Sequence, residues 1–120
     1  MPRVFIVNEP DESRAPEGRA TYDTNPARAF GQIVFINPAD QPVPVRDPER
    51  AVERAHEVLA DASEDDFLVW AGGDPLGLII AASILADKTD GQFTYLKWDR
   101  AARAYAPAPL DLFPDNGEIE

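Results

Sequence analysis

Two Asp-Pro pairs constrain the fold of this chain more than any other feature of its sequence. Asp47-Pro48 and Asp74-Pro75 each stand before a segment with helical character. The Asp side chain can accept hydrogen bonds from free backbone N–H groups at a helix start, and proline is tolerated in the first turn. Short runs of β-branched and aromatic residues lie before and after both segments. The chain is therefore predicted to alternate between strand and helix.

The predicted strands are rich in Val, Ile, Phe and Tyr and end at turn residues. They cover Arg3–Asn8, Phe30–Ile36, Phe67–Ala71, Gln92–Trp98 and Ala104–Ala108. Because strands that alternate with helices are joined by right-handed crossovers, the fold class is α/β. We expect a mostly parallel sheet of four or five strands, flanked by helices and ending in an antiparallel edge hairpin at the C-terminus. Pro107 and Pro109 confine the last strand to a sheet edge.

The second predicted helix, Pro75–Lys88, is apolar on nearly all sides. A helix of this kind is buried on more than one face. One face is expected to pack on the sheet, and the other on a further surface such as a second copy of the chain. We therefore expect a homo-oligomer. Residues 1–110 are expected to form a single domain, and residues 111–120 a flexible acidic tail.

The charge of the chain excludes several classes of partner. The sequence has 22 acidic and 11 basic side chains, a net charge of −11. Nucleic acids and anionic membranes attract a surplus of Lys and Arg, so we expect neither as a partner. The acidity favours solubility, or alternatively a surface that occupies a basic groove on a protein partner. With no cysteine, targeting segment or long apolar stretch, we expect a cytoplasmic protein.

The candidate ligand-binding residues lie at the predicted ends of the strands. In open α/β sheets, ligands bind at the carboxyl edge. Gly72 and Gly73 follow a predicted strand and Asp74 begins a helix, whose free N–H groups favour an anion. Asn8 ends the first strand on the same edge, and Arg100, in the hairpin turn, can clamp a phosphate. The alternative interpretation is a tight turn and a helix cap without a ligand.

The sequence predicts no catalytic residue, metal ligand or cofactor. His56 is the single histidine, and without cysteine an ordinary zinc site is excluded. No serine lies in a nucleophile elbow, and no spacing brings two acid–base groups together. We therefore expect a non-enzymatic protein, since an enzyme would have to rely on carboxylates or His56.

The pattern of short elements resembles the small α/β proteins encoded by tailed bacteriophages. The resemblance rests on these segments and residues: Val4–Asn8, Phe30–Phe35, Asp65–Val69, the glycine turn with the Ala-rich helix, Leu96–Asp99 and Tyr105. Sponge proteins that block the Thoeris defence by sequestering a cyclic ADP-ribose signal are similar in size and build. The resemblance implies a phage accessory protein and a nucleotide-like ligand, and it transfers no site residue.

Two function hypotheses follow from the sequence. In the first, the chain binds a small anionic or nucleotide-like ligand at Gly72–Asp74, and is a candidate counter-defence sponge. In the second, it is an acidic protein–protein interaction module, either an inhibitor of a basic partner or a virion accessory protein. The second hypothesis relies on the net charge, on the loop Glu9–Ala29 and on the acidic tail.

Overall fold

A computed structural model describes residues 2–10 and 24–114 of the chain. The strands are β1 (Arg3–Asn8), β2 (Gln32–Asn37), β3 (Phe67–Val69), β4 (Gln92–Asp99) and β5 (Ala104–Asp111), and the helices are η2 (Asn25–Ala29), α1 (Pro48–Val58) and α2 (Pro75–Thr89). They form one mixed sheet with the strand order β2-β1-β3-β4-β5. Strands β1 to β4 are parallel, and β5 is antiparallel to β4. The predicted C-terminal hairpin is thus confirmed.

The two Asp-Pro pairs begin helices as predicted. The Asp47 carboxylate accepts the Arg50 N–H at 3.3 Å, and the Asp74 carboxylate accepts the Leu76 N–H at 2.8 Å. Pro48 and Pro75 are the first residues of α1 and α2. Each cap satisfies one of the N–H groups that a helix start leaves without an intrahelical partner.

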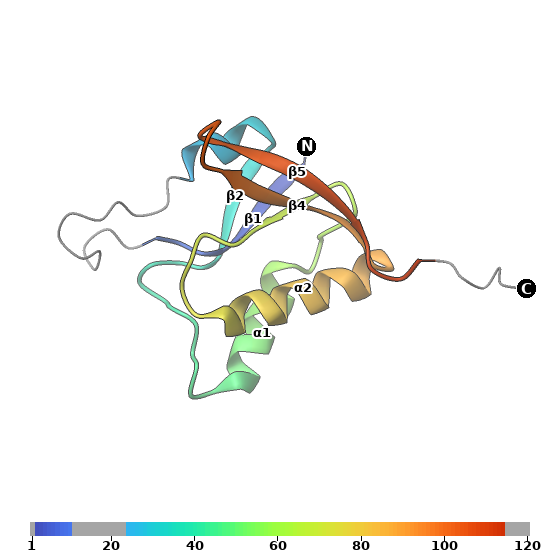
Figure 1. The fold of residues 1–120 in the computed structure, drawn as a ribbon. Helices are drawn as coiled ribbons and strands as arrows, with labels where there is room; N and C mark the ends of the chain where they lie inside the picture. The colour runs from blue at the N-terminus through green and yellow to red at the C-terminus, as the bar shows by residue number, and fades with distance from the viewer. Residues whose placement is uncertain (1, 11–23, 115–120) are drawn as a thin grey trace, which may run out of the picture.

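The two faces of the sheet are covered differently. The helices α1 and α2 lie on one face, where they pack on Phe5, Val7 and Leu68, whereas the short 3₁₀ helix η2 lies on the other, with Ala27 packed beside Val4 (Figure 1). The prediction of a sheet flanked by helices therefore holds only in part. The predicted loop Glu9–Ala29 contains η2, which sequence reasoning missed.

The direction of each crossover explains this asymmetry. The step from β1 to β2 runs toward one edge of the sheet, whereas the steps from β2 to β3 and from β3 to β4 run toward the other. Right-handed connections that run in opposite directions lie on opposite faces. Consequently η2, between β1 and β2, is separated from both α-helices.

Helix α2 is covered on two sides, by the sheet and by α1. Its buried residues include Ala81, Leu85 and Ala86. Ile79 nevertheless remains 62% exposed. The prediction that α2 is buried on more than one face is met within the chain, and a second copy on this helix stays a prediction.

The C-terminal strand is longer than predicted. It continues to Asp111, and the Leu112 N–H then donates to the Gly91 carbonyl at 2.9 Å. Phe113 packs against Gly91, whose φ of +79° and close contact with the Phe113 ring both favour glycine. The first residues of the predicted tail therefore continue the hairpin, and residues 115–120 lie outside the described part of the chain.

A buried carboxylate ties the start of β1 to the loop before β3. Asp66 is 3% exposed and accepts the backbone N–H groups of Arg3 at 2.8 Å and Ser63 at 2.9 Å. The Arg3 guanidinium lies 3.4 Å from the same carboxylate and also donates to the Asp61 carbonyl. The charge is therefore compensated by both backbone and side-chain donors.

We predict that Asp66→Ala lowers the free energy of unfolding by about 3 kcal/mol, because it leaves two backbone donors and a cation without their acceptor. Chemical denaturation measures the change. The neighbouring Asp65→Ala, which removes an exposed carboxylate, serves as the control and should change stability by no more than about 0.5 kcal/mol. Equal effects of the two substitutions would contradict the role assigned to Asp66.

Candidate functional site

The strand order reverses between β1 and β3, at the centre of the sheet. Chain segments that follow these two strands leave toward opposite faces, η2 on one and α2 on the other. In open α/β sheets such a reversal is where ligands bind, outside the carboxyl ends of the strands. Asn8 ends β1 here, and Gly72 and Gly73 lie between β3 and α2. The predicted position of the double-glycine bend at this rim is therefore confirmed.

Asn8 and the glycine bend are in direct contact. The Asn8 Nδ2 donates to the Gly72 carbonyl at 2.8 Å. Gly72 and Gly73 both have positive φ, +89° and +87°. A Cβ atom on Gly73 would stand 2.7 Å from Asn8 Nδ2. The side chain of Asn8 thus spans the rim and fits against a residue that has no side chain.

Asp74 makes the start of α2 less suitable for an anion. Its carboxylate already accepts the Leu76 N–H, so a negative charge occupies the place that a phosphate would take. The close approach of Asn8 explains why position 73 is a glycine, and capping of α2 explains why position 74 is an aspartate. Neither residue therefore needs a ligand to explain it. What remains for a ligand at this rim is hydrogen bonding by the Asn8 amide and the Gly72 carbonyl, both neutral groups.

Arg100 is not brought to the same place. It lies in the turn after β4, where the Asp99 carboxylate accepts the N–H groups of Ala101 and Ala102. Because β4 is parallel to β3, this turn belongs to the same edge of the sheet. Within the described part of the chain, however, the Arg100 side chain makes no hydrogen bond or ion pair. The structure therefore joins four of the five predicted residues, and Arg100 stands apart.

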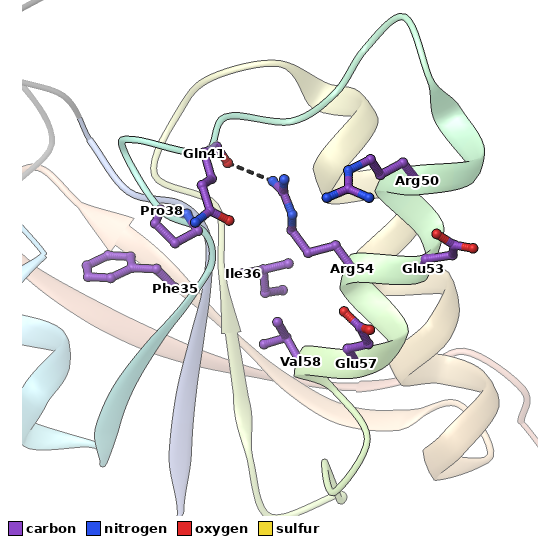
Figure 2. A pocket seen from close by; sticks show the side chains of 9 residues that line it. All are labelled: Phe35, Ile36, Pro38, Gln41, Arg50, Glu53, Arg54, Glu57 and Val58. Atoms are coloured by element: carbon purple, nitrogen blue, oxygen red, sulfur yellow. Dashed lines mark hydrogen bonds between the residues drawn. The ribbon is translucent and has the colours of Figure 1, made fainter.

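A hollow of about 380 Å3 lies farther along this edge, between α1 and the end of β2. Its lining combines both signs of charge with apolar side chains: Phe35, Ile36, Pro38, Gln41, Arg50, Glu53, Arg54, Glu57 and Val58 (Figure 2). The four charged residues all come from α1, and the apolar ones come mainly from β2 and the chain that follows it. Such a surface suits a partner that carries both charged and apolar groups.

Arg54 anchors one wall of the hollow. Its Nη1 donates to the Asn37 Oδ1 at 2.9 Å and to the carbonyls of Gln41 at 2.7 Å and Pro42 at 3.2 Å. Asn37 is 5% exposed, and its amide also donates to the Val7 carbonyl at 3.0 Å. These bonds hold the segment after β2 against α1, which keeps the hollow open (Figure 2).

Sequence reasoning missed this hollow. The signal that could have revealed it is the spacing of Arg50, Glu53, Arg54 and Glu57, which places four charges on one side of α1. Spacing alone, however, does not distinguish a solvated helix side from one that faces a neighbouring strand.

The described residues contain no group of three or more His, Asp or Glu side chains that could hold a metal ion. His56 is exposed on α1 and does not line the hollow. In the same part of the chain, no helix is long and apolar enough to cross a membrane.

Comparison with known proteins finds one family. Residues 2–112 match the family model described as Phage Pam3 gp32-like protein. No curated protein and no solved structure matches the chain. The match supports the bacteriophage part of the resemblance seen in the sequence and does not extend to Thoeris sponge proteins.

We predict that Gly73→Ala destabilises the protein by about 2 kcal/mol, because of its positive φ and the contact with Asn8. In the Asn8→Ala background the two closest contacts, with the amide nitrogen and Cγ, are absent, and the same substitution should cost only about 1 kcal/mol. Denaturation of the two single variants and the double variant measures this coupling. Additive effects would show that Asn8 does not pack against Gly73.

Proposed function

The chain belongs to the Phage Pam3 gp32-like family, and on this basis we propose that it is a non-enzymatic phage accessory protein that binds another polypeptide through β2 and α1. We call this surface the β2–α1 side; it comprises the outer edge of β2 and the hollow beside it. The hollow is the observation that carries the proposal, because it lies next to β2, which is an edge strand of the sheet.

A polypeptide partner fits the chemistry of this side. Peptides bind exposed sheet edges through backbone hydrogen bonds, while neighbouring pockets select their side chains. Strand β2 is an edge strand of the sheet, and its residues Ile33, Val34 and Phe35 are only partly buried. The hollow adds two arginines and two glutamates within reach of the same partner. The β2–α1 side therefore offers backbone, apolar and charged contacts together.

The acidic character of α1 supports a partner with basic groups. On α1, Glu49, Glu53 and Glu57 are all exposed, and each follows the one before it by four residues. Like charges at this spacing lie side by side on a helix and repel one another, so the row costs helix stability. In the described residues the only ion pair is that of Arg3 with Asp66. Basic side chains on a partner surface would relieve the repulsion within the row.

We predict that the purified chain binds at least one protein encoded by the same phage, itself included, when each is tested pairwise by biolayer interferometry. Glu53→Arg reverses a charge in the hollow and should weaken binding about tenfold. Glu64→Arg makes the same charge change at an exposed position beyond α1 and should leave binding unchanged. No binding to any of these proteins, or equal losses in the two variants, would overturn the proposal.

A small ligand at the junction of β1 and β3 is the second candidate function. The reversal of strand order favours it, since this is the usual ligand position in open α/β sheets. The Asn8 amide and the Gly72 carbonyl match the donor and acceptor pattern of a nucleobase better than a phosphate. If this candidate function is right, the chain could act as a counter-defence sponge that sequesters a nucleotide signal. Arg100 would then be available to bind the phosphate groups of that nucleotide.

The second candidate predicts a rise in melting temperature with a nucleotide-like ligand. A panel of mononucleotides, cyclic dinucleotides and cyclic ADP-ribose isomers is tested by thermal shift. At a ligand concentration of about 100 times Kd, the midpoint should rise by about 10 °C. Asn8→Ala should abolish the shift, whereas Lys97→Ala, on an exposed part of β4, should keep it. No shift across the panel removes this candidate.

A further inference from the structure

We infer that the partner of the β2–α1 side is a second copy of this chain, bound about a two-fold axis, so that two β2 strands pair antiparallel and two α1 helices pair beside them. This inference rests on the proposed function and names its partner. Three observations support it: the open edge of β2, the blocked edge of β5, and the arrangement of charge on α1.

The outer edge of β2 is open to another strand. The Gln32 N–H donates to the Pro2 carbonyl at 3.1 Å, toward β1. Because successive backbone groups of a strand alternate in direction, Ile33 and Phe35 direct their N–H and C=O groups away from β1. None of the described residues pairs with them. Neither charge nor proline protects β2, although natural sheets usually protect their edges in this way.

The opposite edge of the sheet is closed by proline. Strand β5 pairs with β4 from Ala104 to Asp111, and Pro107 and Pro109 lie within this continuous pairing. A proline nitrogen cannot donate to β4, so both nitrogens lie on the outer side and remove donors from that edge. The sheet can therefore add a strand at β2 and not at β5. Two copies that pair through β2 form a closed dimer rather than a growing fibre.

The charges on α1 are complementary to their own two-fold image. A two-fold axis that pairs antiparallel helices matches each residue with the one equally far from the centre on the other side. With the centre between Glu53 and Arg54, Arg50 meets Glu57 of the second copy, and Glu53 meets its Arg54. Every pair joins opposite charges. A partner of another sequence has no need of this symmetry, which is why a second copy is favoured.

The strand and helix contacts lie on the same side of the molecule. Phe35, one of the two residues whose backbone groups point away from β1, lines the same hollow as the four charged residues of α1, so the outer edge of β2 at Phe35 lies beside the charged side of α1 (Figure 2). The Arg54 bonds described above all use Nη1, and within the described residues Nη2 has no partner. That nitrogen can serve the pair with Glu53 of the second copy.

Charge reversal tests this arrangement by sedimentation equilibrium. Arg50→Glu and Glu57→Arg each turn two attractive contacts of the dimer into repulsive ones, and each should raise the dimer Kd about tenfold. The double variant restores opposite charges and should return Kd to within about threefold of the wild type. Lys97→Glu and Glu64→Arg repeat the two charge changes at exposed positions elsewhere and should leave Kd unchanged.

Both reversals are compatible with a folded α1. A glutamate at position 50 lies in the first turn of the helix and an arginine at position 57 in the last, and both favour the helix dipole. Weaker association in these variants therefore reports on the interface. Hydrogen exchange adds an independent measurement: the amides of Ile33 and Phe35 should be protected in the wild type and exposed in Arg50→Glu, while the inward amide of Val34 is protected in both.

Three results would overturn the inference: a wild-type monomer at all concentrations tested, a double variant no better than the single ones, or a dimer with unprotected Ile33 and Phe35 amides. These outcomes are distinct from failure of the proposed function. If another phage protein binds the β2–α1 side while the chain itself stays monomeric, the function stands and the dimer is wrong. If no protein binds, both are wrong.

Discussion

The fold depends on the burial of β1 between β2 and β3. Val4, Phe5, Ile6 and Val7 are all fully buried, with alternate side chains on opposite faces of the sheet. A central parallel strand of this kind needs a cover on both faces, because neither row of side chains is polar. Helices α1 and α2 provide one cover, and η2 contributes to the other. Removing either cover would expose apolar surface to water. The strand order that keeps β1 in the centre is therefore stabilised by the hydrophobic effect.

The same central strand determines what the carboxyl edge can do. Since the connections beside β1 and β3 leave on opposite faces, their ends meet at Asn8 and Gly72. The polar groups there largely satisfy one another, and Asp74 satisfies the start of α2. A hollow with accessible charge develops instead where β2 ends and α1 passes over it. This contrast between the two places is the reason we propose a polypeptide partner rather than a small anion.

The two edges of the sheet differ in a way that bears on association. An open β2 and a proline-containing β5 allow pairing at one end only. The family match places the chain in a family of phage proteins. In the proposed dimer, the apolar strand β2 would supply affinity, and the alternating charges of α1 would fix the relative orientation of the two copies.

Local chemistry determined much of this protein directly. Asp-Pro caps, β-branched runs and the prolines of the last strand act through their own backbone geometry and their near neighbours, so the helix starts, the strands and the edge position of β5 could be predicted. The glycine bend at the rim followed from the crossover rule. Tertiary structure alone decided that α1 and α2 share one face, that Asn8 fills the rim, and that the charged side of α1 faces β2. These outcomes depend on the strand order. That order is determined by the joint burial of residues that are distant in the sequence.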